Sequence, residues 1–311
     1  MTTFHQVGER GIIQRLARLV PGRPDVRVGI GDDVAVVEHT GDHDLLLTSD
    51  AVIEQVHFLS DAPAEQVGHK AAGRVLSDFA AMGGEPLWAL VDLVAPAETR
   101  VEWAESVYRG AARLASRFHL AIVGGDTTAG PVRELHVFGV GRVPAGKAVL
   151  RSGAKPGDVV HVTGSLGGSL AGRHLAFEPR VAEGRWLREG GWATAMLDIS
   201  DGLVVDLERL LESSGVGAEV RADRVPVSAE ARAQKDGRTA LDHALSDGED
   251  YELLFTVPAA RAADFEAAWK KEFDLPCAPI GRMTDRKGIL VLRDAAGKLI
   301  RPFCEGYEHF A

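Results

Sequence analysis

Hydrophobic residues recur along this chain with two periods, one typical of helices and the other of strands. A spacing of three or four residues predicts helices over residues 12–20, 63–82, 101–119, 169–176, 180–189, 203–214 and 260–273. Short apolar runs predict strands over residues 26–37, 44–53, 87–94, 120–123, 134–143, 159–163, 218–227, 251–257 and 289–292. Because helices and strands alternate irregularly, this pattern favours two α/β or α+β domains over one doubly wound sheet.

A stretch rich in proline and glycine lies near the middle of the chain, at residues 144–158. Such residues interrupt regular structure, and this composition is typical of a link between domains. We therefore expect an N-terminal domain over residues 1–145 and a C-terminal domain over residues 146–311.

The composition is that of a globular protein with an acidic balance. The 311 residues are 45% hydrophobic and 26% charged, which suits cores of ordinary size. The 35 Gly and 14 Pro follow no period, so a collagen-like or disordered chain is excluded. Lys and Arg number 35 against 45 Asp and Glu, which gives a net charge of −10. A broad basic face for nucleic acid or for an anionic membrane is therefore not expected.

Neither the N-terminal residues nor the cysteines indicate export. The first residues lack the charged and apolar regions of a signal peptide, and no apolar stretch approaches the ~18 residues of a membrane span. Cys277 and Cys304 form no C-x-x-C pair, so neither a disulfide framework nor a thiolate zinc site is indicated. We expect a soluble cytoplasmic protein.

Aspartates recur beside Gly, Ser or Thr, just after an apolar strand or at the start of a helix. The six sites are residues 31–33, 48–50, 77–78, 124–128, 198–202 and 246–250. Taken singly, each site is more typical of a turn or a helix cap. Taken together, they supply hard oxygen ligands of the kind that Mg²⁺ prefers, on loops where glycine allows a close approach to a ligand. Clustered carboxylates repel one another, so their convergence would imply bound cations.

Magnesium also reconciles the negative net charge with an anionic ligand. An acidic protein can hold polyphosphates where divalent ions lie between carboxylate and phosphate oxygens. The same ions would neutralise charge in a phosphoryl transfer, where positioning and electrostatics supply most of the catalysis.

Two glycine-rich segments resemble phosphate loops without matching them. Residues 141–148 nearly fit G-x-x-x-x-G-K-[ST], but Ala148 replaces the hydroxyl residue and no long helix follows, so we reject this motif. Residues 164–169 precede a predicted helix, and they could either form a tight turn or donate backbone N–H groups to a phosphate.

Eight segments, in this order, resemble the thiamine-monophosphate kinases over essentially the whole chain. They are V-G-I-G-D-D at 28–33, T-S-D at 48–50 with H-F at 57–58, L-S-D-F-A-A-M-G at 76–83, G-G-D-T-T at 124–128, R-S-G-A-K-P-G-D at 151–158, D-I-S-D-G-L at 198–203, G-E-D-Y-E-L at 248–253 and G-Y-E-H-F at 306–310. The resemblance implies a two-domain fold like that of aminoimidazole ribonucleotide synthetase, with N-terminal domains that pair in a homodimer. It also implies transfer of the γ-phosphoryl group of ATP to thiamine monophosphate, with thiamine diphosphate and ADP as products.

The resemblance assigns roles to individual residues of this chain. It implies that several Mg²⁺ ions are bound, directly or through water, by Asp33, Thr48, Ser49, Asp50, Asp78, Asp126, Asp198 and Asp201. It implies ATP contacts from Tyr108, Gly125, Asp126, Arg151 and Ser200, and thiamine contacts from His57, Glu249 and Tyr307. One departure is visible, because the family usually has a longer stretch, often with an R-P-x-P-R element, in place of residues 174–180.

The chemistry implied needs no strong general base. The acceptor is a phosphate monoester with a second pKa of about 6, so most of it is dianionic at neutral pH. We therefore expect neither a phosphoenzyme nor an indispensable proton-transfer residue. Three alternatives remain: an ATP-dependent synthetase of the same superfamily, a nucleotide-binding protein without catalysis, and a magnesium-dependent phosphatase. The absence of cysteine before residue 277 disfavours a selenide-handling synthetase.

Overall fold

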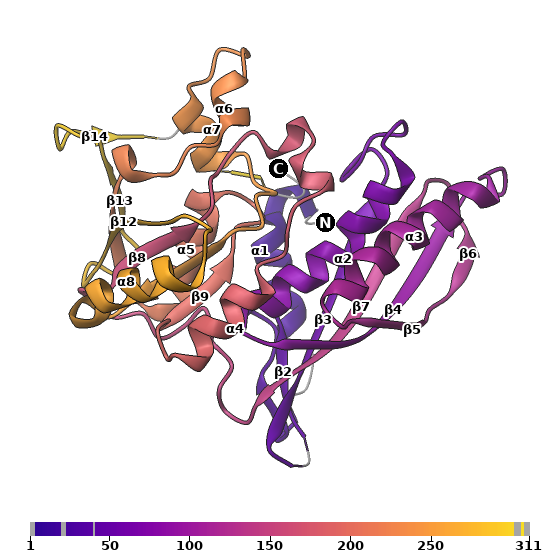
Figure 1. The fold of residues 1–311 in the computed structure, drawn as a ribbon, viewed down its shortest axis with the longest axis horizontal. Helices are drawn as coiled ribbons and strands as arrows, with labels where there is room; N and C mark the ends of the chain where they lie inside the picture. Colours follow the sequence, from indigo (N-terminus) through magenta and orange to yellow (C-terminus); the bar gives the residue numbers. More distant parts are fainter. Residues whose placement is uncertain (1–3, 20–22, 40, 302–305, 308–311) are drawn as a thin grey trace.

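The computed structural model describes residues 4–19, 23–39, 41–301 and 306–307, and its described part contains two mixed sheets of seven strands each (Figure 1). The first sheet has the order β1 (Val26–Val28), β2 (Ala35–Glu38), β3 (His43–Ile53), β7 (Glu134–Pro144), β4 (Glu85–Ala95) and β5 (Ala121–Gly124), with β6 (Thr127–Ala129) also beside β4. Strands β5 and β6 run parallel to β4, and the other pairs are antiparallel.

The second sheet is built from the C-terminal half of the chain. Its order is β14 (Leu299–Ile300), β13 (Leu290–Arg293), β10 (Gly217–Arg221), β12 (Cys277–Thr284), β8 (Val159–Thr163), β11 (Leu253–Val257) and β9 (Ala195–Asp198). Among the described strands of this sheet, β10 and β13 pair in parallel and the other pairs are antiparallel. All residues of the central strands β8 and β11 are buried, as expected for strands covered on both faces, and those of the edge strand β9 are buried too.

The described helices are α1 (Phe4–Ala17), α2 (Ala64–Ala81), α3 (Val101–Arg117), α4 (Val181–Glu189), α5 (Leu203–Ser214), α6 (Ala229–Ala233), α7 (Ala240–Ser246) and α8 (Ala262–Glu272). Helices α2 and α3 cover one face of the first sheet, and α2 also contacts α4 and β9, so it lies between the two sheets (Figure 1). Within the described residues, no helix has both the length and the apolar character needed to cross a bilayer.

Helices α2 and α3 approach each other closely because a glycine of each helix lies against the backbone of the other. A Cβ atom on Gly68 would lie 1.8 Å from the carbonyl oxygen of Val107, and one on Gly110 would lie 1.8 Å from that of Glu65. The backbones are thus in direct contact, which leaves no room for a side chain at either position.

The apolar residues form two clusters. One joins the inner face of the first sheet to α2, α3 and α4 and continues to the aromatic side chains of α8, including Phe265 and Trp269. The other lies on the opposite face of the second sheet, under α5 and α7. Because α2 belongs to the first cluster, its position is determined by packing against both halves of the chain.

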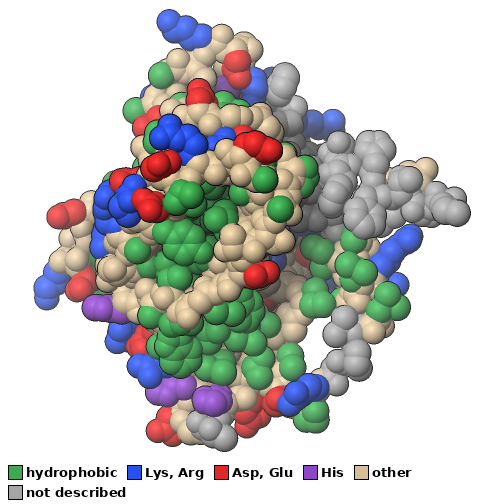
Figure 2. Space-filling view, turned by 90° about the vertical axis from the view of Figure 1, so that its right-hand side faces the viewer, with side chains coloured by type: hydrophobic (Ala, Val, Ile, Leu, Met, Phe, Trp, Pro, Cys, Tyr) green, Lys and Arg blue, Asp and Glu red, His purple; other side chains and the backbone are tan. Residues whose placement is uncertain are grey.

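The outer face of the first sheet carries exposed apolar side chains. Trp88, Leu90, Val123 and Phe138 are between 39% and 60% exposed on β4, β5 and β7. Figure 2 views the molecule from this side and shows hydrophobic side chains gathered over a continuous area. Contiguous apolar patches of this kind are uncommon on monomeric soluble proteins.

Most predicted elements are present, and the predicted helix over 169–176 is wrong. This segment forms two 3₁₀ turns, Ser169–Ala171 and Arg173–Leu175, because Gly168 and Gly172 adopt positive φ angles of 67° and 130° that interrupt a helix. The predicted strand over 218–227 ends at Arg221 and is followed by a 3₁₀ turn. Strands β6, β9, β12 and β14 and helices α6 and α7 were not predicted, since they are short or irregular in their apolar pattern.

Candidate active site

A cleft of about 680 Å³ lies where the two halves of the chain meet. The first half contributes β3, α2 and the loop before β2, and the second contributes the end of β9, the loop after it and the last turns of α5. Helix α1 also lines it, through Arg10 and Ile13. The cleft contains these predicted site residues: Asp33, Thr48, Ser49, Asp50, Asp78, Arg151, Asp198, Ser200 and Asp201.

Three carboxylates converge in this cleft. Oxygen atoms of Asp33, Asp78 and Asp198 all lie within 4.8 Å of one another. Asp33 precedes β2, Asp78 lies in the last turns of α2, and Asp198 ends β9. Three acidic segments that are far apart in the sequence therefore form one cluster.

Hydroxyl groups hold two of these carboxylates in place. The Thr48 hydroxyl of β3 donates to Oδ2 of Asp78, and the Ser77 hydroxyl donates to Oδ2 of Asp198 at 2.5 Å. Burial raises the pKa of Asp78 well above its ordinary value, and the carboxylates of Asp50 and Asp198 raise it further. Burial, followed by the charge of Asp33, raises the pKa of Asp198 to about 8. Carboxylates this close together repel one another as anions, and a bound cation would relieve that repulsion.

Arginines from both halves of the chain lie among the acids of the cleft. The Arg151 guanidinium donates to both carboxylate oxygens of Asp33, at 3.1 and 2.7 Å, and Arg209 pairs with Asp201 at 2.5 Å. Arg74 of α2 donates to Oδ1 of Asp50 at 2.6 Å. The cleft therefore supplies guanidinium groups for phosphate oxygens as well as carboxylates for metal ions.

The loop before α5 is held by a carboxylate that the sequence analysis did not select. Oδ2 of Asp206 accepts hydrogen bonds from the backbone N–H groups of Ser200, Asp201 and Gly202, at 2.9 to 3.2 Å. Burial, with the nearby Asp201, raises the pKa of Asp206 to about 7. Asp206 thus fixes the backbone on which Ser200 and Asp201 are presented to the cleft.

Of the predicted residues that do not line the cleft, three line a second cavity of about 720 Å³ at the edge of the first sheet. This cavity is lined by Tyr108, Gly125 and Asp126, together with residues of α3, β5 and β6. The backbone N–H of Asp126 donates to Asp92 at 2.8 Å. Gly125 has a φ of 148°, and a Cβ atom there would lie 1.9 Å from the carbonyl oxygen of Val91, so only glycine fits. Asp126 is therefore not one of the three clustered carboxylates, although it was predicted as a metal ligand.

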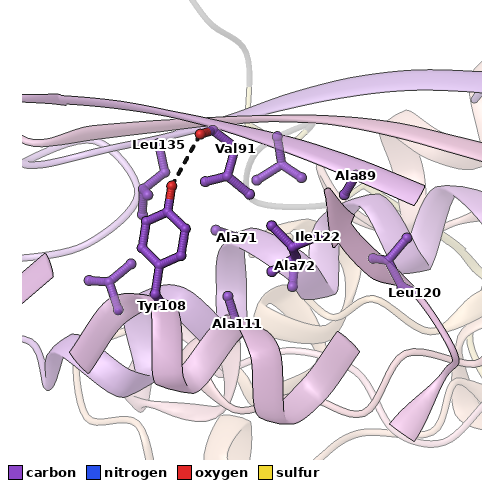
Figure 3. A pocket seen from close by; sticks show the side chains of 11 residues that line it. Ala71, Ala72, Ala89, Val91, Tyr108, Ala111, Leu120, Ile122 and Leu135 are labelled. Atoms are coloured by element: carbon purple, nitrogen blue, oxygen red, sulfur yellow. Dashed lines mark hydrogen bonds between the residues drawn. The ribbon is translucent and has the colours of Figure 1, made fainter. Parts of the chain in front are cut away.

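Tyr108 points from α3 toward the first sheet (Figure 3). Its hydroxyl donates to the carbonyl oxygen of Val91 at 3.2 Å, and its ring lies beside a small apolar void lined by Ala71, Ala72 and Leu135 (Figure 3). Burial, followed by the charge of Asp92, raises the pKa of the Tyr108 phenol. One edge of Tyr108 lines the second cavity, beside the predicted ATP contact Gly125.

The predicted thiamine contacts His57 and Glu249 are joined by a lysine that sequence reasoning missed. The ammonium of Lys70, on α2, donates to the carbonyl oxygen of His57 at 2.7 Å and forms an ion pair with Glu249. Lys70 is fully buried. The third predicted contact, Tyr307, is half exposed, and its backbone N–H donates to the carbonyl oxygen of Asp201 at 3.0 Å, next to the cleft.

The glycine-rich segment at 164–169 forms a tight turn, which is the first of the two structures that its sequence allowed, and not a phosphate-binding loop. The backbone N–H of Gly167 donates to both carboxylate oxygens of Asp250, at 3.0 and 2.9 Å, and that of Gly168 donates to Asp247 at 2.8 Å. These carboxylates occupy the positions that a phosphate would take.

The sequence did contain a signal for the missed cations of α2. Lys70 and Arg74 precede Asp78 at intervals of four residues, which places all three close to one face of a helix. Arg209 and Asp206 are also local neighbours, since both lie on α5 shortly after Asp201 and they pair three residues apart; an acidic residue in the first turn of a helix was the signal for Asp206.

Comparison with known proteins agrees with this architecture. Residues 31–143 match the model of AIR synthase related protein, N-terminal domain, and residues 178–293 match that of AIR synthase related protein, C-terminal domain. The two sheets and the cleft between them therefore define an AIR synthase related protein.

Individual relatives identify the family within this broader class. The chain is 41% identical over 299 residues to the thiamine-monophosphate kinase of Rhodopirellula baltica, covering 92% of each protein. It is similar to the structure of AaThiL complexed with AMPPCP and TMP, with a TM-score of 0.86, 33% identity and 99% of each chain covered. It is also similar to the thiamine-monophosphate kinase from Stenotrophomonas maltophilia, with a TM-score of 0.75, 34% identity and coverage of 93% of this chain and 96% of the other. The chain belongs to the thiamine-monophosphate kinase family.

Proposed function

We propose that this protein phosphorylates thiamine monophosphate with ATP by direct in-line transfer of the γ-phosphoryl group in the cleft between the two sheets. One structural observation carries the proposal: Asp33, Asp78 and Asp198, from distant segments, meet within 4.8 Å beside arginines suited to phosphate. Family membership supplies the identity of donor and acceptor.

The residues of the cluster fit Mg²⁺. All are hard oxygen donors, and the raised pKa values of Asp78 and Asp198 indicate a site whose anionic form needs a cation. Asp33, Asp78 and Asp198, with Thr48, Ser49, Asp50 and Asp201 around them, would hold several ions. When bound, Mg²⁺ neutralises phosphate charge and polarises the transferred group.

The other residues of the site bind and orient the two substrates. Arg151 and Ser200 in the cleft, with Tyr108, Gly125 and Asp126 at the second cavity, bind ATP. His57, Glu249 and Tyr307 bind the thiamine moiety. Asp126 would reach a metal ion only as part of this ATP site, because it lies apart from the three clustered acids.

The acceptor needs no proton removed at neutral pH, since its phosphate is mostly dianionic. The chain's contribution is therefore to hold two polyanions in line and to exclude water around them. We accordingly assign no general base and expect no phosphoenzyme.

The proposal includes an assembly and a location. The exposed apolar face formed by Trp88, Leu90, Val123 and Phe138 favours a homodimer that buries the first sheet against its copy. The division into domains at residues 145 and 146 and a cytoplasmic location, where ATP is available, complete the proposal.

Product analysis of the purified protein with ATP, Mg²⁺ and thiamine monophosphate tests the function. We expect equal amounts of ADP and thiamine diphosphate. Asp78→Asn should lower kcat at least about 10- to 100-fold and raise the Mg²⁺ concentration required, since even groups that only support metal ligands have effects of this size.

Other outcomes would identify a different function. Orthophosphate release without an acceptor would indicate a phosphatase, and Mg²⁺-dependent ATP binding without ADP formation would indicate a non-catalytic protein. Turnover of an amidine-forming substrate in place of thiamine monophosphate would indicate a synthetase. Unchanged kcat and metal dependence in Asp78→Asn would remove Asp78 from the site.

A further inference from the structure

Helix α2 carries three ionisable residues in a row that connects the two proposed substrate positions. Lys70, Arg74 and Asp78 follow one another every four residues, which is a rise of about 6 Å per step along a helix. Lys70 contacts Glu249, at the proposed thiamine position, and Asp78 belongs to the carboxylate cluster. Arg74 therefore lies between the thiamine position and the cluster, where the phosphate of the acceptor must be when it meets the donor.

Arg74 lines the cleft and has hydrogen-bond donors to spare, whereas Lys70 is fully buried and is not among the residues that line it. The Lys70 ammonium is fully buried and already donates to Glu249 and to the carbonyl oxygen of His57. The Arg74 side chain lines the cleft and is 16% exposed. Its Nη2 donates to Asp50, while its Nε is buried and has no partner among the described residues. A guanidinium carries five N–H donors in a fork that fits phosphate.

The Arg74 side chain remains positively charged in this environment. A guanidinium does not lose its proton in proteins, and the ion pair with Asp50 at 2.6 Å holds this one in place. A fixed cation at this point reduces the repulsion between two polyanions, which is the main obstacle to the transfer.

We propose that Arg74 is a further catalytic residue, which binds the phosphate of thiamine monophosphate and holds it in line with the γ-phosphoryl group. This inference rests on the proposed function. In the step itself, a bond forms between an acceptor phosphate oxygen and the γ-phosphorus, while the bond from that phosphorus to its bridging oxygen breaks. The electron pair of the broken bond leaves with ADP, and no proton moves when the acceptor is a dianion.

Calorimetric titration with thiamine monophosphate and with thiamine tests the assignment directly, because the two ligands differ only in the phosphate. Both titrations are made with Mg²⁺ and a non-hydrolysable ATP analogue present. Arg74→Gln should weaken binding of thiamine monophosphate about 10- to 100-fold, as expected for lost charge-assisted hydrogen bonds. It should leave the affinity for thiamine within about twofold.

Two further variants complete the experiment. Arg74→Lys keeps the charge but not the fork, and should lie between wild type and Arg74→Gln in affinity for thiamine monophosphate. Arg221→Gln removes an arginine that pairs with Asp223 at the surface and does not line the cleft, and it should match wild type for both ligands.

The outcomes separate the two proposals. An unchanged affinity for thiamine monophosphate in Arg74→Gln, with wild type active, overturns the role of Arg74 and leaves the function intact. An equal loss of affinity for both ligands also overturns it, since Arg74 would then only support the fold of the pocket. Wild-type protein that binds no thiamine monophosphate and forms no ADP contradicts the proposed function and this inference together.

Discussion

Lys70 connects two residues of the proposed thiamine position that come from different halves of the chain. Its buried ammonium holds the carboxylate of Glu249 from the second half and the backbone of His57 from the first. Glu249 has a φ of 53°, a conformation that costs free energy for any residue but glycine. The ion pair and a hydrogen bond from Ser169 to the Glu249 carbonyl oxygen, at 2.6 Å, help to hold it there.

Replacing Lys70 should disturb the binding of one substrate more than the other. Lys70→Met keeps the length of the side chain but leaves Glu249 without its cation. We expect the KM for thiamine monophosphate to rise on the order of tenfold, with a smaller change in the KM for ATP, because removing one partner of a buried pair is costly. Steady-state kinetics with each substrate varied in turn measures this. Equal effects on both KM values would contradict a positioning role for Lys70.

The same variant should have a distinct pH dependence of stability. Burial, opposed by the charge of Glu249, lowers the pKa of Lys70 from 10.5 to about 8. Between these values the unfolded chain binds a proton that the folded protein does not, so this group makes the free energy of unfolding rise with pH. Urea unfolding at pH 8, 9 and 10 should show this rise in wild type relative to Lys70→Met. Parallel curves for the two proteins would contradict the lowered pKa.

At the scale of elements, α2 is the helix on which the site depends. It carries Lys70, Arg74 and Asp78, packs against the first sheet and α3, and contacts β9, whose end provides Asp198. Its position relative to α3 is fixed by direct backbone contact at Gly68 and Gly110. A change at this contact must move α2, and with it the groups that face the cleft.

Gly110→Ala tests this dependence. The added methyl group would meet the carbonyl oxygen of Glu65, which is backbone and cannot turn away. We expect a loss of about 1–3 kcal/mol in the free energy of unfolding, as for other overpacked contacts, together with a lower kcat. Chemical denaturation and steady-state rates measure the two effects. Ser116→Ala, on the exposed side of the same helix, should change neither, and a Gly110→Ala protein as stable as wild type would refute the contact.

At the scale of the whole molecule, the outer face of the first sheet is an exposed apolar surface that a partner could cover. The inner face of this sheet packs on α2 and α3, while Trp88, Leu90, Val123 and Phe138 are exposed on the other side (Figure 2). A second copy of the chain would cover the same apolar area on both partners, as closed two-fold symmetry requires.

Charged substitutions on this face should produce monomers. We expect wild type to have the mass of a dimer in light scattering, and Leu90→Glu with Phe138→Glu to have the mass of a monomer, because burying two carboxylates without partners is unfavourable. Leu299→Glu places a charge on an exposed leucine of β14 in the second sheet, and should remain dimeric. A monomeric wild type would refute the dimer while leaving the site in the cleft untouched.

The sequence was sufficient for much of the fold, since apolar periodicity acts locally. The long helices α2 and α3 and the long strands β3, β4 and β7 follow from their patterns. The failures were at short elements: the 3₁₀ turns at 169–175 depend on glycines with positive φ, and β9 and β12 have no clear alternation. Such segments take their structure from neighbours that lie far away in the sequence.

The sequence by itself determined which chemical groups the protein has: aspartates beside glycines and hydroxyls, and three ionisable residues at four-residue intervals on one predicted helix. Only the tertiary structure decided which of these groups meet. It brought Asp33, Asp78 and Asp198 together, left Asp126 in a second cavity, and gave Lys70 and Arg74 their partners in Glu249 and Asp50. The physical reason is that residue type and local spacing set backbone preference and charge, whereas contacts between distant segments depend on how the two sheets pack around α2.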